Sequence, residues 1–165
     1  MIHYPLEEVL TIKKNRFDAA TKILQEKKTL LEKARQELQK RLEEKEKARL
    51  HRAEKLAGLR ETMSKEGTVK EIEQGELYLK LATETLAEKE RKVVEQEKVV
   101  AGAEKQLEAA TAEMLIKKRE WEKMQLHKEE WMKEAHFEEA RKEEKERDEE
   151  GATLYTTRKR KEGKQ

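Results

Sequence analysis

Apolar residues recur at every seventh position through the second half of the chain. Eight successive heptads carry one at the same place: Ile72, Leu79, Leu86, Val93, Val100, Leu107, Met114 and Trp121. A seven-residue repeat collects these side chains into one stripe along an α-helix, and a second helix must cover that stripe. The pattern therefore predicts a coiled coil rather than a globular core.

The first half of the chain carries a stripe of its own. Pro5, the only proline, suits the first turn of a helix, and acidic residues follow it. The apolar column of this helix is Leu10, Phe17, Leu24, Leu31 and Leu38. The column then meets Lys45 and Arg52, so we expect a four-residue stutter that moves the stripe onto Leu42, Leu56 and Met63.

A break between the two helices is predicted at residues 64–68. Gly67 can adopt the left-handed conformation that ends many helices. Thr68 and Glu71 have the spacing of a capping box, in which each side chain bonds a backbone N–H of the new helix. We therefore expect helix 1 over about residues 5–63 and helix 2 over about 69–150. A turn this short folds the two helices back as an antiparallel hairpin.

The hairpin has a testable register. A turn centred near Gly67 pairs residues whose numbers sum to about 135, which places Leu56 opposite Leu79 and Leu31 near Ala103. Large residues that face small ones let the helices approach closely, so we expect tight packing near the turn and around Ala103 to Ala110. Helix 2 is the longer helix, so beyond about Trp131 it overhangs without a partner from this chain.

The C-terminal end of the chain is expected to leave the helix. Gly151 offers a stop signal, and residues 151–165 contain a run of four basic residues, Arg158 to Lys161. The sequence thus predicts one all-α domain over residues 1–150, an antiparallel coiled-coil hairpin with an overhang. A flexible basic tail follows it.

Composition agrees with a long coiled coil. Charged residues make up 46% of the chain and aromatic residues 4%, whereas an ordinary domain is about a quarter charged. The net charge is +2 with both signs interspersed, so no nucleic-acid partner is expected. The N-terminus lacks a signal-peptide pattern, and no apolar run approaches the roughly 18 residues that span a bilayer. We expect a cytoplasmic protein without membrane insertion.

No pattern in the sequence points to catalysis. It contains no phosphate-binding loop, no zinc-protease motif and no cysteine. His127 and His136 are nine residues apart, which places them on opposite faces of a helix. We therefore expect a non-enzymatic protein with no catalytic residue, no cofactor and no metal site.

The aromatic residues of helix 2 indicate a contact site instead. Trp121 and Trp131 fall on core columns, and Trp121 is expected to close the open end of the hairpin. For Trp131, core packing and partner contact stay equally open, because helix 1 ends near there. Exposed apolar residues on a charged helix favour binding to another protein. The partner-contact candidates are Trp131, Met132, His136 and Phe137.

Two segments resemble the YscO/FliJ family of type III secretion proteins. The N-terminal match comprises Tyr4-Pro5-Leu6, Val9-Leu10, Ile12-Lys13, Arg16 and Ala19-Ala20. The segment from His127 to Ala135, HKEEWMKEA, looks like chlamydial YscO-like members. The resemblance implies a cytosolic stalk at the base of the secretion apparatus that couples the secretion ATPase hexamer to the export gate. It also implies binding of secretion chaperones or of the needle-length regulator.

Two other readings of the residues stay open. A parallel homodimeric rod would keep the heptads but would have to run through the break at residues 64–68. A generic coiled-coil scaffold, a holdase-type chaperone or a nucleic-acid-associated coiled coil would share this composition. Salt-sensitive binding that depends on Arg158 to Lys161 would favour nucleic acid.

Overall fold

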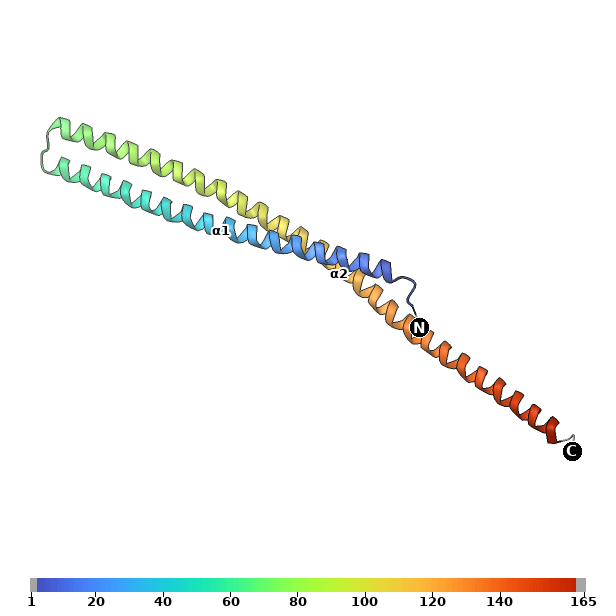
Figure 1. The fold of residues 1–165 in the computed structure, drawn as a ribbon. Helices are drawn as coiled ribbons and strands as arrows, with labels where there is room; N and C mark the ends of the chain where they lie inside the picture. Colours follow the sequence, from blue (N-terminus) through green and yellow to red (C-terminus); the bar gives the residue numbers. More distant parts are fainter. Residues whose placement is uncertain (1–2, 163–165) are drawn as a thin grey trace. The chain divides into compact units, whose positions relative to one another are not determined.

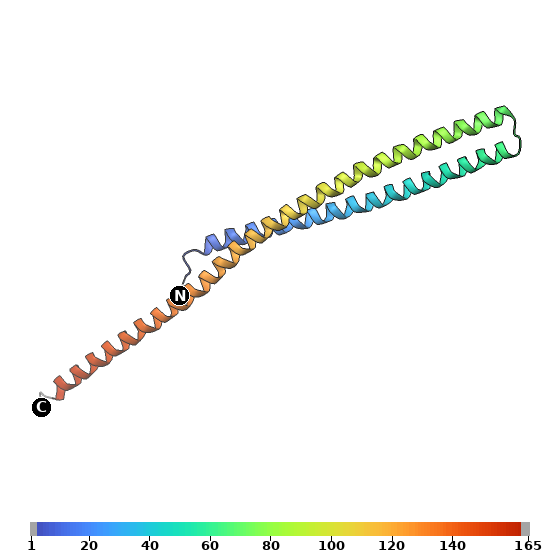
Figure 2. The ribbon, with the colours of Figure 1, turned by 180° about the vertical axis from the view of Figure 1, so that it is seen from behind.

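Two long α-helices make up the part of the chain that the structure describes. In the computed structural model, which describes residues 3–162, α1 spans Glu7–Ser64 and α2 spans Val69–Glu162. No strand occurs among these residues. Over residues 20–114 the two helices lie side by side and are joined by a turn, as both ribbon views show (Figure 1, Figure 2). The predicted all-α fold of two long, packed helices is confirmed.

Contacts divide the chain into two compact units, and both helices contribute to each. Unit 1 comprises Met1–Ala19 and Leu115–Gln165, and unit 2 comprises Ala20–Met114. In unit 2 the Arg52 Nε donates a hydrogen bond to the Thr83 hydroxyl, a pair whose numbers sum to 135. In unit 1 Glu7 pairs with Lys128, with the same sum. The helices are therefore antiparallel within each unit, in the register that the sequence predicts.

The heptad columns continue without interruption along both helices. Every residue of these columns is buried or half-buried: Leu10, Phe17, Leu24, Leu31, Leu38, Lys45, Arg52 and Leu59 in α1, and the eight predicted residues from Ile72 to Trp121 in α2. An unbroken seven-residue repeat is the pattern of a regular coiled-coil seam.

The predicted stutter in α1 is wrong. Leu42 and Met63 are 38% and 53% exposed, whereas Leu59 is 8% exposed and continues the original column. Leu56 is only half-buried. The register persists through Lys45 and Arg52 because such side chains can pack their aliphatic stems along apolar surface and keep the charge in water.

Polar contacts cross the seam beside these basic positions. The Lys89 Nζ donates a hydrogen bond to a Glu44 carboxylate oxygen at 2.8 Å, and this bond, with the Lys89 charge, lowers the pKa of Glu44. At the second basic position, the Arg52 Nε donates to the Thr83 hydroxyl at 3.1 Å. Where the apolar column is interrupted, polar groups lie between the helices. Contacts of this kind satisfy their hydrogen-bonding capacity.

The turn places its left-handed residue one position earlier than the sequence suggests. Glu66 has φ 53°, and no described glycine has a positive φ. The Gly67 N–H donates to the Thr62 carbonyl at 3.0 Å, the 6→1 bond of a Schellman motif. Gly67 is needed for space instead, because an added Cβ would lie 2.6 Å from Thr62 Cγ2. The prediction that Gly67 is left-handed is wrong.

The predicted capping box at the start of α2 is confirmed. The Thr68 backbone N–H and hydroxyl both donate to Glu71 Oε2, at 2.8 and 2.9 Å. The Glu71 N–H donates in return to the Thr68 hydroxyl at 3.4 Å. The backbone bond first and the hydroxyl bond second lower the pKa of Glu71. A helix stop and a helix start therefore occupy only residues 65–68.

The prediction that helix 2 ends near residue 150 is wrong. α2 continues through Gly151 to Glu162, so most of the segment expected to be a flexible tail is helical. Glycine in a helix interior costs only about 1 kcal/mol relative to alanine, which a long, already propagating helix tolerates. Thr153 and Thr157 also bond the backbone of the preceding turn, through Glu149 and Thr153 carbonyls. Residues 163–165 of the predicted tail lie outside the described residues.

Candidate partner-contact site

The segment before α1 is anchored rather than extended. Tyr4, which precedes α1 by three residues, is 2% exposed. The Glu7 N–H donates to the Tyr4 carbonyl at 3.3 Å, and the Leu10 N–H donates to the Leu6 carbonyl at 3.0 Å. Pro5 lies in the turn that leads into the helix. These bonds position the Tyr4 ring against α2.

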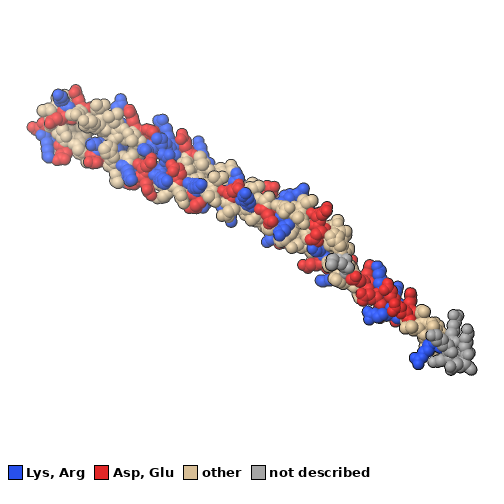
Figure 3. Space-filling view, in the orientation of Figure 1, with Lys and Arg blue, Asp and Glu red and all other residues tan. Residues whose placement is uncertain are grey.

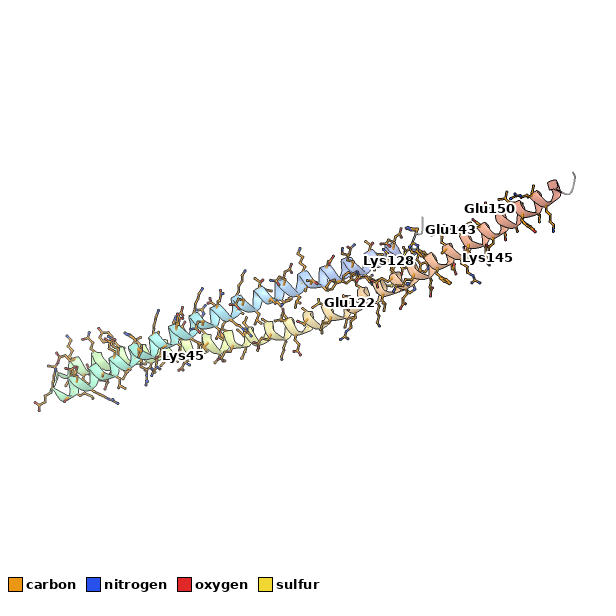
Figure 4. All side chains as sticks on the ribbon, turned by 90° about the horizontal axis from the view of Figure 1, so that it is seen from below. Lys45, Glu122, Lys128, Glu143, Lys145 and Glu150 are labelled. Atoms are coloured by element: carbon orange, nitrogen blue, oxygen red, sulfur yellow. The ribbon has the colours of Figure 1, made fainter. Side chains whose placement is uncertain are left out.

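Tyr4 is the centre of a cluster that we call the N-terminal clasp: Tyr4, Glu7, His127, Lys128 and Trp131. The Tyr4 hydroxyl shares a 2.6 Å hydrogen bond with His127 Nδ1, and its ring meets Trp131 edge-on with centroids 5.5 Å apart. The Lys128 Nζ lies 6.0 Å from the Tyr4 ring centroid and 2.6 Å from a Glu7 carboxylate oxygen. Figure 4 shows Lys128 beside the first turns of α1. The clasp therefore joins the N-terminal end of α1 to α2.

A second aromatic pair lies two to three turns inward in the same unit. Phe17 and Trp121 stack with centroids 5.3 Å apart and ring planes 8° from parallel. The Lys13 Nζ donates to Glu120 Oε2 at 2.7 Å, and that hydrogen bond lowers the pKa of Glu120. Stacked rings and a partly shielded ion pair both strengthen the pairing of the helices. Trp121 thus packs between the helices, as its heptad position predicts.

The four predicted contact residues separate into two groups. Trp131 and Met132 are half-buried, and Trp131 packs on Tyr4. His136 is exposed, and Phe137 is 70% exposed. Contact of any of them with another protein stays a prediction. Of the four, His136 and Phe137 are the two exposed residues.

The overhang is a single charged helix. Every residue from 136 to 159 is exposed. The Arg147 guanidinium lies 3.5 Å from a Glu143 carboxylate, an i,i+4 pair of the kind that supports a free helix by about 0.3–0.5 kcal/mol. Acidic side chains gather along this stretch in Figure 3, and Figure 4 labels Glu143, Lys145 and Glu150 on it. The overhang thus presents charge on all sides.

Sequence reasoning missed two exposed apolar residues near the C-terminal end of α2. Leu154 and Tyr155 are 72% and 66% exposed and follow the acidic stretch that ends at Glu150. The sequence predicts that helix 2 ends near residue 150, and this prediction places both residues in a flexible tail. Residues 151–157 contain no charged residue, so the i,i+4 charge spacing that signals the helix before Gly151 is interrupted there.

A shallow groove lies at the other end of α2, beside the turn in unit 2. Residues of both helices line it: Glu54, Lys55, Ala57, Gly58, Leu59, Glu61, Thr62, Glu71, Gln74, Gly75 and Tyr78. Gly75 lets the helices approach, since an added Cβ would lie 2.9 Å from Leu59 Cδ1. The Lys55 Nζ lies 5.9 Å from the Tyr78 ring centroid. Tyr78 is 47% exposed and gives this groove, which we call the turn groove, an aromatic wall.

Neither a metal-binding cluster nor a membrane-spanning stretch occurs among the described residues. Among the described residues, no three His, Asp or Glu side chains are grouped closely enough to hold a metal ion. Likewise, neither described helix has an apolar stretch that could cross a membrane. Aromatic rings, exposed apolar residues and charged helix faces are features of protein-binding surfaces.

Comparison with known proteins assigns this arrangement to a family. The family model described as YscO-like protein matches residues 1–161. A solved structure described as a proposed YscO homologue from Chlamydia trachomatis has 44% sequence identity and a TM-score of 0.85. The match covers 97% of this chain and 99% of that chain. No curated protein sequence matches the chain.

Proposed function

Because this chain belongs to the YscO-like family, a family associated with type III secretion, we propose that it is a non-enzymatic, stalk-like coiled coil of a bacterial type III secretion system. Its role is to couple the secretion ATPase hexamer to the export gate. The supporting observation is that the two ends of α2 present different surfaces. One end has the clasp and the charged overhang, and the other has the turn groove.

The clasped end is the proposed contact with the ATPase. The clasp holds the first turns of α1 on α2, so the paired part ends in a defined cluster rather than in frayed ends. Beyond it, Phe137 projects an exposed ring directly before the charged run of residues 138–150. An exposed aromatic residue surrounded by polar residues is the usual anchor of a protein interface.

The turn groove is the proposed contact with the export gate. It combines a half-exposed tyrosine with the small residue Gly58, which leaves room for an inserted side chain. An added Cβ at Gly58 would meet no atom within 4 Å. Secretion chaperones and the needle-length regulator are further proposed partners, and the cytoplasmic base of the apparatus is the proposed location.

Two single substitutions test the coupling role. Phe137→Glu places a charge where an aromatic anchor is proposed, so it should lower ATPase stimulation and ATPase pull-down at least about tenfold. Tyr78→Glu should leave ATPase stimulation unchanged but weaken binding to the cytoplasmic domain of the export gate by a similar factor. Each variant is the control for the other, because both positions are exposed and both exchanges introduce the same charge.

The coupling role requires each substitution to weaken one contact and to leave the other unchanged. Circular dichroism and thermal unfolding establish that both variants keep the wild-type helix content. If the folded Phe137→Glu protein stimulates the ATPase fully and the Tyr78→Glu protein binds the gate fully, the stalk assignment is wrong. Equal loss of both activities in both variants would also contradict it, since coupling requires two separate contacts.

A further inference from the structure

One flank of unit 2 carries apolar side chains that stay exposed in the single chain. Ile23, Leu30 and Val99 are 47%, 51% and 54% exposed. Ile23 and Leu30 are seven residues apart on α1, and Val99 and Gly102 are three residues apart on α2, so each pair shares a helix face. We call these four residues the lateral patch.

A hydrogen bond shows that the two pairs lie on the same flank. The Lys27 Nζ donates to Gln106 Oε1 at 2.9 Å. Lys27 lies one helical turn from both Ile23 and Leu30, and Gln106 lies one turn from Gly102. The ion pair of Arg35 with Glu104, at 2.9 Å, lies on the other flank of the seam. The lateral patch is therefore one surface to which both helices contribute.

Gly102 has no role within the single chain that explains a glycine. It lies inside α2 without a positive φ, and an added Cβ would meet no atom within 4 Å. Glycine in a helix interior costs about 1 kcal/mol relative to alanine. A glycine that the fold does not require, beside exposed apolar residues, is typical of a place where another backbone approaches closely.

We propose that the lateral patch binds the lateral patch of a second copy of this chain. A two-fold axis parallel to the helices of unit 2 places α1 of one copy against α2 of the other. The pairing follows the same register as within one chain, in which residue numbers sum to about 135. Leu30 then faces the notch between Gly102 and Ala109 of the other copy, and Ile23 faces the small residues next to it. The patch is thus self-complementary, a ridge on α1 beside a notch on α2.

The charges that border the patch fit the same arrangement. Glu26 and Glu37 border it on α1, and Lys98 and Lys105 border it on α2. The two-fold arrangement brings Glu26 of one copy near Lys105 of the other, and Glu37 near Lys98. Lys33, the cation on the α1 border, falls level with Gly102, where the missing side chain leaves room for its stem. Complementary borders of this kind set the orientation of partners more than their affinity.

The expected association is weak. The patch is small against the roughly 800 Å² that each partner buries in a standard interface, so we expect a dissociation constant on the order of 100 μM. Such a dimer is populated at the high local concentrations of an assembly and dissociates when the protein is dilute. The inference concerns only unit 2 and does not depend on the proposed stalk role.

Sedimentation equilibrium of the full chain, from about 5 to about 500 μM, tests the inference. Wild-type protein should change from monomer to dimer over this range, and Val99→Glu should remain a monomer. Val94→Glu is the matched control, because Val94 is 49% exposed on the same helix but lies about 140° around it. The control should dimerise like the wild type.

Two glycine substitutions test whether the second copy approaches α2 closely at Gly102. Gly102→Leu should raise the thermal stability of the dilute monomer and should weaken dimerisation at least about tenfold, because the new side chain fills the notch. Gly151→Leu is the control, since Gly151 is also helical with no atom near its added Cβ. It should leave dimerisation unchanged.

The opposite outcomes overturn the proposal. A wild-type chain that stays monomeric at every concentration shows that the patch does not bind a second copy. A dimer that survives both Val99→Glu and Gly102→Leu shows that the copies meet through another surface.

Discussion

At the scale of single residues, Glu66 and Gly67 meet two different requirements of the turn. Glu66 adopts the left-handed backbone conformation, and Gly67 supplies the space next to Thr62. A left-handed conformation costs a residue with a side chain roughly 1–2 kcal/mol, a cost that glycine avoids. The turn therefore holds a strained glutamate beside a glycine that cannot be replaced without displacing Thr62.

This division predicts opposite effects of two substitutions. Glu66→Gly should raise the free energy of unfolding by up to about 1 kcal/mol, because it removes the strain. Gly67→Ala should lower the free energy of unfolding, because its Cβ would lie 2.6 Å from Thr62 Cγ2. Urea unfolding followed by circular dichroism measures both. Glu66→Ala is the control, since it removes the carboxylate but keeps the strain, and a gain from it equal to that of Glu66→Gly would refute the explanation.

At the scale of elements, α1 carries basic side chains at positions of its seam that are usually apolar. Lys45 and Arg52 occupy the column between Leu38 and Leu59, and Figure 4 labels Lys45 on α1. The apolar stripe of α2 is unbroken at the same level. The seam is thus asymmetric, with a continuous stripe on one helix and an interrupted stripe on the other.

An apolar residue at position 45 should strengthen the seam. Lys45→Leu should raise the free energy of unfolding by about 1 kcal/mol, because a half-buried leucine removes additional apolar area from water. Lys47→Leu, at an exposed position of the same helix, should change it by less than about 0.5 kcal/mol. Chemical unfolding of the two variants in parallel makes the comparison. Destabilisation by Lys45→Leu would mean that the ammonium group itself supports the hairpin.

At the scale of the whole molecule, each unit has its own means of holding α1 to α2. Unit 2 has the turn and the greater part of the heptad seam. In the described part of unit 1 no turn joins the two helices, and the Phe17–Trp121 stack and the N-terminal clasp pair them. The clasp uses a residue that precedes α1, so a short N-terminal segment controls where the pairing in unit 1 ends.

Removal of the Tyr4 ring should loosen unit 1 alone. Tyr4→Ala should reduce local stability by about 3 kcal/mol, since a buried aromatic side chain is lost. Amide hydrogen exchange should accelerate over residues 7–17 and 118–131 and should stay unchanged over residues 79–93. Tyr4→Phe keeps the ring but loses the 2.6 Å bond to His127, and should cost only about 1 kcal/mol. Equal acceleration in both units would contradict separate stabilisation.

The sequence predicted the elements and the pairing well because both depend on local or periodic signals. Heptads and a capping box are legible in one chain, and the short break between the helices leaves only one way for them to meet. The helix end predicted at Gly151 is wrong because glycine destabilises a helix by only about 1 kcal/mol relative to alanine. A long helix tolerates a cost of that size. The predicted stutter is wrong because it rests on apolar residues alone, whereas Lys45 and Arg52 also occupy the seam.

The candidate contact residues were only partly predictable. Their heptad positions placed Trp121 between the helices, and left Trp131 undecided. The tertiary structure gave Trp131 a partner in Tyr4, a residue that lies 127 positions earlier and carries no periodic signal. Phe137 stayed exposed, as its position outside the heptad columns predicts.

By itself, the sequence determined that two helices form, where they turn and which stripes face each other, because helix period and capping act over a few residues. Only the tertiary structure decided which polar side chains join the seam, which residue of the turn takes the strain, and how Tyr4 closes unit 1. It also showed which apolar side chains stay uncovered in the lateral patch. These outcomes depend on distances between residues that are remote in the chain, and no local pattern encodes such distances.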